Sequence, residues 1–319
     1  MANLPFTPRL PLAPLQLQGH SGSVPHVAGK IRESLDLIRS EPGRLEQTRY
    51  SLLDMKYRSI AFDLYVVGYP LKDVRDAFAG LALAGLKVVQ LRGTEDPILK
   101  VVVTLDNRYP PGDPRHASEA PAHPPGTKDY SVGNSSDNFL YVTAALASGE
   151  FDLARSIAAL AWEPPDADWI GPRSFCTPND VRIATAVKHL FAGERDAALA
   201  ELTRVRPNKW ELESKDQEGV AGMLRALARD DANAFIVALN GSLRWHEHAF
   251  KQQWNLDFYL SLPGTGLSAL ALHRGLIARD DLDDDSPYLP LGLIDLALDR
   301  ARAGSAPEFR VFEPSEFGA

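Results

Sequence analysis

Apolar residues recur every three or four positions over most of this chain, which places them on one face of an α-helix. Three such segments lie between residues 24 and 91, and Glu41-Pro42-Gly43 and Gly68-Tyr69-Pro70 separate them. Small residues crowd the third segment, where they allow close helix packing. The pattern therefore predicts a compact helical bundle over residues 24–105.

A repeated phrase marks helix ends in the second half: an apolar end, a Gly or Asp, an acidic residue, then a run rich in small residues. The turn residues are Gly149, Gly193, Asp230 and Gly275, at intervals of 44, 37 and 45 residues. A left-handed Gly followed by an acid in the next first turn is typical of a tight helical hairpin. Such intervals indicate stacked helix pairs, which usually form binding surfaces rather than catalytic pockets.

The expected fold class is all-α: an N-terminal helical bundle followed by stacked antiparallel helical hairpins, similar to an α-solenoid. Pro287 is expected at the first position of the last helix, with Ser286 as its N-cap. The helices expected after Asp137 cover residues 137–147, 150–162, 179–192, 194–204, 215–229, 231–252, 264–278 and 287–303.

Four regions follow from these patterns. Residues 1–23 are rich in Pro, Gly and Ser and are expected to form an extended arm, because Pro blocks helix formation. Residues 24–105 form the bundle, residues 106–137 a linker or loop insertion, and residues 138–319 the hairpin domain. The β-branched stretch 98–105 is read equally well as a strand or as a buried helical segment.

Composition limits the cellular locations that we expect for this protein. No window approaches the roughly 18 uncharged apolar residues that a membrane span needs, so no membrane association is expected. The N-terminus lacks the basic start and apolar core of a signal peptide. A single cysteine, Cys176, excludes an intrachain disulfide and fits a reducing cytosol, so a cytoplasmic location is expected.

Charge is distributed unevenly along the chain. Residues 1–138 carry 16 Lys and Arg against 15 Asp and Glu, whereas residues 139–319 carry 18 against 27. This acidic half argues against a nucleic-acid partner, which would require concentrated positive charge. It suits a basic protein partner recruited by electrostatic steering. An acidic surface without a partner explains the composition at least as well.

Three motifs resemble chemical sites but lack the geometry, the neighbouring strand or the residues that those sites need. No catalytic residue, cofactor or metal is therefore expected. The histidines of Arg244-Trp245-His246-Glu247-His248 stand two apart and would point roughly 200° away from each other on a helix. Gly264-Thr265-Gly266 matches a dinucleotide fingerprint, but acidic residues follow its helix where a strand is required. The run from Asp280 to Asp285 lacks the Gly and the final Glu of an EF-hand.

Candidate partner-binding residues are aromatic and acidic side chains in the last third of the chain. Trp is enriched at interface hot spots, although most tryptophans on apolar helix faces belong to the core. The acidic run is expected either to cap the next helix or to dock a basic partner. The candidates are Trp245, Glu247, Trp254, Asp257, Asp280, Asp281, Asp283, Asp284 and Asp285.

The second half resembles the immunity protein 49 family of bacterial polymorphic-toxin systems. The resemblance is carried by Asn138-Phe139-Leu140, by the Ala-rich hairpin at Gly149-Glu150, by residues 224–231 with the helix after them, and by residues 267–275. It implies an all-α cytoplasmic protein that binds one cognate toxin and blocks its active site, with no catalysis of its own. The acidic half is what we expect if that toxin is a basic nuclease.

Two other hypotheses stay open. One is a general helical-repeat adaptor or regulator, although the intervals exceed the 34-residue unit of tetratricopeptide repeats. The other is an enzyme in a helical fold, using His246, Glu247, Asp257 or Cys176. Clustering of these four side chains in one enclosed pocket would favour the enzyme.

Overall fold

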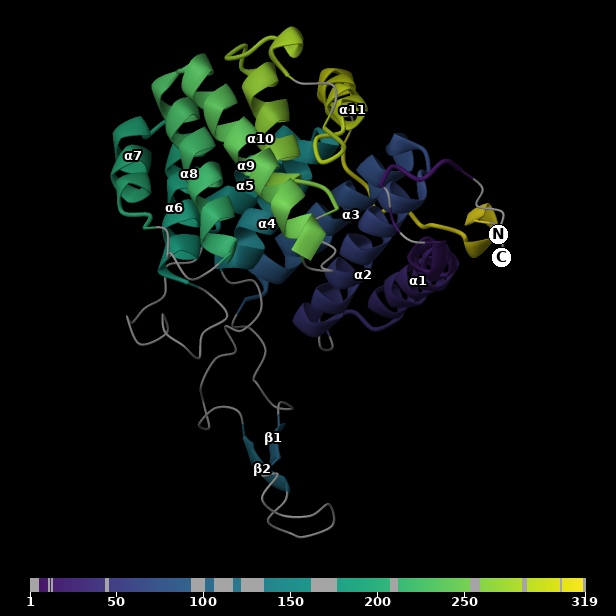
Figure 1. Ribbon diagram of the computed structural model, residues 1–319. Helices are drawn as coiled ribbons and strands as arrows, with labels where there is room; N and C mark the ends of the chain where they lie inside the picture. Colours follow the sequence, from purple (N-terminus) through teal and green to yellow (C-terminus); the bar gives the residue numbers. More distant parts are fainter. Residues whose placement is uncertain are drawn as a thin grey trace.

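The described part of the chain is all-α, with eleven α-helices and one pair of short strands (Figure 1). None of its helices combines the length and apolar character needed to cross a membrane. The computed structural model describes residues 6–10, 12, 14–43, 46–92, 101–105, 117–121, 135–161, 177–206, 212–252, 259–282, 286–304 and 306–317.

The first three helices form the expected N-terminal bundle, in which α2 packs against both neighbours. They are α1 (Pro14–Ser40), α2 (Glu46–Val67) and α3 (Leu71–Gln90). Helix α1 begins ten residues earlier than expected, so the prediction of an extended arm is wrong for residues 14–23. Pro14 occupies the first helical position, where no N–H is needed. Burial of Leu17 and Val24 offsets the cost of Pro25 inside the helix.

The β-branched stretch forms a strand rather than a helix. Strand β1 (Val101–Leu105) pairs antiparallel with β2 (Ala117–Pro121), and Val103 faces Glu119 in the register. Residues 98–100 lie outside the described residues. The partner strand falls within the stretch expected to be a linker or loop, and its sequence Ala-Ser-Glu-Ala-Pro carries no β-branched signal that would have identified it.

Helical hairpins follow, as the repeated phrase predicts. The turn residues all adopt the left-handed conformation, with φ of 84° at Gly149, 82° at Gly193, 54° at Asp230 and 70° at Gly275. Their shared geometry confirms the reading of each phrase as a helix end. The helices are α4 (Ser135–Ser148), α5 (Phe151–Ala159), α6 (Pro178–Ala192), α7 (Arg195–Thr203), α8 (Leu212–Arg229), α9 (Ala232–Gln252), α10 (Leu262–His273) and α11 (Leu291–Ala303).

The last helix begins later than expected. Helix α11 starts after Pro290, so Pro287 and Ser286 do not open it. The preceding segment forms a turn instead, in which the Leu289 N–H donates to the Ser286 carbonyl at 3.2 Å, and contacts with distant residues hold this turn in place. The Tyr65 hydroxyl donates to the Pro287 carbonyl, and the Ser261 N–H donates to the Tyr288 carbonyl at 2.9 Å.

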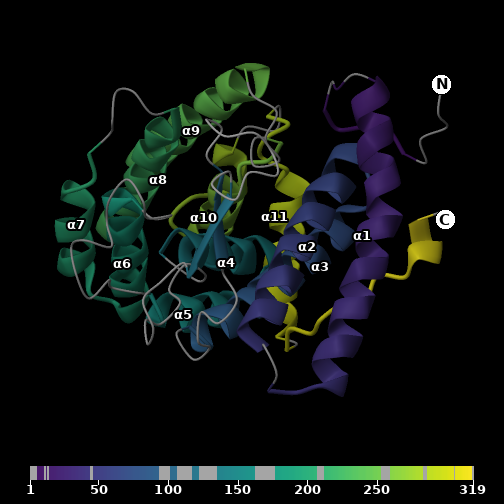
Figure 2. The ribbon, with the colours of Figure 1, turned by 90° about the horizontal axis from the view of Figure 1, so that it is seen from below.

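Helix α4 lies at the centre of the molecule, between the N-terminal bundle and the α6–α9 helices (Figure 2). Small residues on its neighbours make this possible. A Cβ at Gly85 of α3 would overlap the Tyr141 ring, and one at Gly266 of α10 would lie 2.6 Å from the Thr143 carbonyl oxygen. The dinucleotide-like glycines therefore serve helix packing. Because α10 returns to α4, the stack closes on itself instead of extending as an open solenoid.

The C-terminal segment returns to the bundle. It runs to the 3₁₀ helix η4 (Pro314–Phe317), which packs against α1. The Phe309 ring stacks on Tyr57 with centroids 6.0 Å apart, and the Tyr57 hydroxyl donates to the Arg310 carbonyl at 2.7 Å. The Arg310 guanidinium also forms an ion pair with Asp73 of α3. Aromatic packing and charge pairing thus hold the C-terminal segment against the N-terminal bundle.

Replacing Gly85 by Ala is expected to lower the free energy of unfolding by about 1–3 kcal/mol, because the added methyl group overpacks the contact with Tyr141. Urea unfolding measures the change. Gly241→Ala is the matched control: a Cβ there meets nothing within 4 Å, so it should leave the stability unchanged or raise it by up to about 1 kcal/mol. Equal stability of Gly85→Ala and wild type would contradict the close approach of α3 and α4.

A buried carboxyl group joins α2 to α4. Asp54 is 6% exposed and accepts a hydrogen bond from the Tyr141 hydroxyl. Burial raises the pKa of Asp54 to about 7, although the hydrogen bond from Tyr141 acts in the opposite direction. The fold therefore favours the protonated form of this group.

Asp54→Asn is expected to reduce the pH dependence of stability. The unfolded pKa of Asp is about 3.9, so the stability that protonated Asp54 contributes is fully present below about pH 4 and is lost as pH rises through 7. The stability of the Asp54→Asn variant relative to wild type should thus increase between pH 4 and pH 8, by on the order of 3 kcal/mol. Thermal unfolding across this range tests it, with Asp152→Asn, at an exposed position, as the control. Parallel profiles for Asp54→Asn and wild type would count against the prediction.

Candidate protein-binding groove

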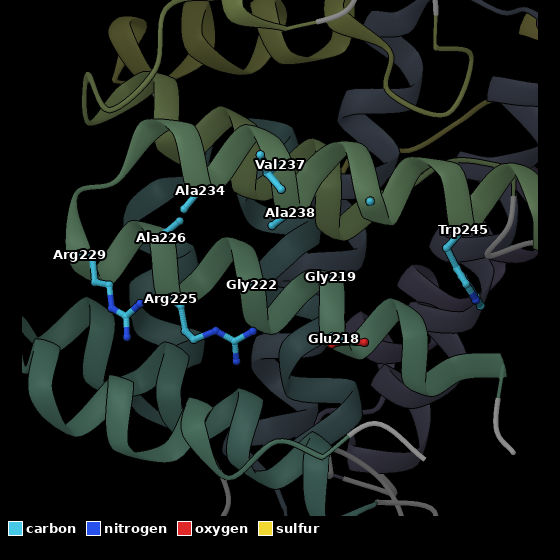
Figure 3. A pocket seen from close by; sticks show the side chains of 11 residues that line it. Glu218, Gly219, Gly222, Arg225, Ala226, Arg229, Ala234, Val237, Ala238 and Trp245 are labelled. Atoms are coloured by element: carbon cyan, nitrogen blue, oxygen red, sulfur yellow. The ribbon is translucent and has the colours of Figure 1, made fainter. Parts of the chain in front are cut away.

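A groove of about 540 Å³ runs along the solvent-facing side of the α8–α9 hairpin (Figure 3). Glycine, alanine and valine make up seven of its eleven lining residues, so its surface is mostly apolar. Helix α8 contributes Glu218, Gly219, Gly222, Arg225, Ala226 and Arg229, and helix α9 contributes Ala234, Val237, Ala238, Gly241 and Trp245.

Glycines set the depth of the groove. A Cβ on Gly222 would lie 2.9 Å from the Ala238 Cβ, and a Cβ on Gly219 would lie 2.9 Å from the Ser242 Cβ. Both distances are shorter than side chains tolerate, so glycine allows α8 and α9 to approach this closely. A Cβ on Gly241 meets nothing within 4 Å, because this position faces open space.

Two larger apolar side chains shape the groove. Val237 is 70% exposed, the highest fraction among the described large hydrophobic residues that stand at the surface. Trp245 is 8% exposed and lies at the far end of the groove from the arginines (Figure 3). Val237 thus offers apolar area that the free chain leaves in water, whereas Trp245 forms part of the wall.

Opposite charges stand at the two ends. Arg225 and Arg229 lie one helical turn apart on α8, and their side chains extend the same way from the helix (Figure 3). The Arg225 Nη1 donates to the Leu202 carbonyl oxygen at 3.1 Å, which ties it to α7. Burial, and then the charge of Arg229, lower the pKa of Arg225. Glu218 lies further along α8 in the direction of Trp245, and its charge acts on Arg225 in the opposite direction, raising the pKa of the guanidinium.

The structure places four of the nine predicted partner-binding residues. Of these, Trp245 lines the groove, and Glu247 is exposed further along α9. Asp280 and Asp281 belong to the 3₁₀ helix η3 (Arg279–Asp281), where the Asp281 carboxylate accepts a hydrogen bond from the Ala278 N–H at 2.7 Å. Asp281 therefore caps its own turn. Trp254, Asp257, Asp283, Asp284 and Asp285 lie outside the described residues.

The side chains proposed for an enzyme are not gathered in the described part of the chain. His246 is buried, its neighbour Glu247 is exposed, and Asp257 and Cys176 lie outside the described residues. Within the described ranges, no group of three His, Cys, Asp or Glu side chains is arranged to hold a metal ion.

The sequence analysis did not identify the contact between His20 and Asp63. The His20 Nδ1 lies 2.7 Å from the Asp63 carboxylate, and its Nε2 lies 3.2 Å from the Tyr259 hydroxyl. These contacts join α1 and α2 to the segment that precedes α10. Both ring nitrogens are engaged, and the pair does not line the groove, so we regard it as a structural link.

The groove residues other than Trp245 were also missed. Their sequence signal is the recurrence of small residues on the two halves of one hairpin, at Gly219, Gly222 and Ala226 and at Ala234, Ala238 and Gly241. The same recurrence appears in the buried helices α3 and α10, where it serves core packing. Only the position of a helix in the fold decides whether its small residues line a groove or pack in the core.

Comparisons with known protein families, with curated proteins and with solved structures find no match to this chain.

Val237→Ser is expected to change the free energy of unfolding by less than about 0.5 kcal/mol, because the side chain is exposed in the free chain. Leu239→Ala, two residues along the same helix and 1% exposed, should cost about 2–5 kcal/mol. Urea unfolding compares the two variants. A loss above about 1 kcal/mol for Val237→Ser would show that this rim is covered in the free protein.

Proposed function

We propose that this protein binds a cognate bacterial toxin through the α8–α9 groove and neutralises it by covering its active site. The observation that carries the proposal is an open, mostly apolar groove with an exposed Val237 and charges at both ends. Recognition needs such a surface: apolar area that is buried on binding and charges that fix the register. The resemblance of residues 138–319 to the immunity protein 49 family supports a toxin as the partner.

Neutralisation of this kind requires no chemistry from the chain. A segment of the toxin fills the groove, and the surrounding faces of α8 and α9 block access to the toxin's active site. We place this encounter in the cytoplasm. The formal charge of −8 agrees with a protein partner rather than a nucleic acid.

Co-expression with the product of the neighbouring gene tests the proposal. Wild type should restore growth and co-purify with the toxin. Gly241→Leu should lose both effects, because its side chain enters the groove without a clash inside the chain. Gly22→Leu is the matched control: Gly22 lies on α1, away from the groove, and a Cβ there also meets nothing within 4 Å. This control should behave as wild type.

Three results would change the conclusion. If wild type neither restores growth nor co-purifies, the toxin proposal fails. If both glycine variants retain binding, the partner uses another surface. Recovery of several unrelated proteins in a pull-down, each lost with Gly241→Leu, would favour the helical-repeat adaptor instead.

A further inference from the structure

The arginines of the groove have unused hydrogen-bonding capacity. A guanidinium offers five N–H donors in a planar fork. Arg225 donates one of these to the Leu202 carbonyl oxygen, and this bond ties its head group to α7. Neither Arg225 nor Arg229 has a carboxylate within ion-pair distance among the described residues. Two adjacent cations therefore line the groove, and no described carboxylate lies at ion-pair distance from them, although the charge of Glu218 acts on Arg225 from further along α8.

Three other arginines of the second half have such partners. Arg195 pairs with Asp230, and Arg310 pairs with Asp73. Arg300 pairs with Glu150 at 2.8 Å. Arg225 and Arg229 therefore combine two properties: they line the groove together, and the described residues place no carboxylate at ion-pair distance from either. A carboxylate from outside would bind both by charge-assisted hydrogen bonds.

The apolar floor and the length of the groove indicate the length and the side-chain size of the rest of the ligand. From Glu218 to Arg229, α8 advances about 16 Å, the length of roughly three helical turns. Gly241 offers no side chain of its own, and a Cβ there would meet nothing within 4 Å, so the backbone of a bound segment can come close. A helix with small apolar residues on one face fits this shape and covers Val237.

We infer that the groove receives an amphipathic helix of the partner, with a carboxylate against Arg225 and Arg229 and small apolar side chains along the glycine floor. This inference rests on the proposed function for the identity of the partner, but its chemistry concerns the groove alone. Acidic residues favour the first turn of a helix and basic residues the last turn. The bound helix therefore begins at the arginine end, runs antiparallel to α8, and brings its basic end to Glu218.

This inference refines the expectation of a basic toxin. The acidic half of the chain attracts a basic partner over long distances, but the groove selects an acidic segment at contact. A basic protein that carries one acidic helix satisfies both requirements.

Two synthetic peptides of about 16 residues test the inference. Each is a capped helix with Ala and Val on one face. The first carries Glu in its first turn and Lys in its last, and the second has these charges exchanged. Fluorescence anisotropy should show that the full-length chain binds the first peptide at least about tenfold more tightly, since each charge-assisted bond to Arg is lost in the second.

Variants of the chain give the matched controls. Arg229→Glu should abolish or reverse the preference between the peptides, and Gly241→Leu should weaken both. Arg244→Glu makes the same charge change at an exposed position of α9 outside the groove, and it should preserve the preference. Circular dichroism confirms that each variant is folded.

Equal binding of the two peptides, no saturable binding of either, or a preference insensitive to Arg229→Glu overturns the inference. So does a dimer in sedimentation velocity that Arg229→Glu dissociates, because a second copy would then occupy the groove. The co-expression experiment is judged separately. A toxin that co-purifies equally with wild type and Arg229→Glu leaves the proposed function standing and removes the inference. Peptide discrimination without a toxin does the reverse.

Discussion

The close approach of helices around α4 is the constraint on which the rest of the structure depends. From Tyr141 to Ser148 every residue of α4 is buried, because neighbouring helices meet it at positions that carry little or no side chain. The Tyr141 ring packs closely against Gly85, and the Thr143 carbonyl packs closely against Gly266. Without these contacts the N-terminal bundle and the hairpins would have no common core. Asp54 and Tyr141 add a polar contact at the same junction.

The α8–α9 hairpin uses the same packing rule and reaches a different result. Gly219 and Gly222 bring its two helices together, as glycines do around α4. No further helix covers this side among the described residues, so the small side chains become the floor of a groove. Exposed apolar area beside desolvated charge is what a protein interface requires. The described residues thus enclose α4 and leave this face of the α8–α9 hairpin open, which is the surface that we propose for binding.

Charge acts on two scales in this molecule. The excess of acidic residues in the second half produces a long-range field, which salt screens within about 8 Å at physiological ionic strength. At the groove, Arg225 and Arg229 present two positive charges that act over a few ångströms, and we infer that they select an acidic group. Long-range attraction and local selection can therefore favour different groups on one partner, and this division gives both a fast encounter and a specific register.

The sequence by itself determined the turns of the second half, because the left-handed residues Gly149, Gly193, Gly275 and even Asp230 are local features of the chain. The helix expected over residues 264–278 ends at His273, before the Gly275 turn. The sequence could not place the start of α1, where packing on α2 offsets the cost of Pro25, nor the start of α11, where Tyr65 holds Pro287 in a turn. Among the residues that line the groove, the sequence identified Trp245 alone as a candidate for partner binding. Whether a stripe of glycine and alanine lies in a core or lines an open surface depends on which distant helices cover it, and only the tertiary structure decides that.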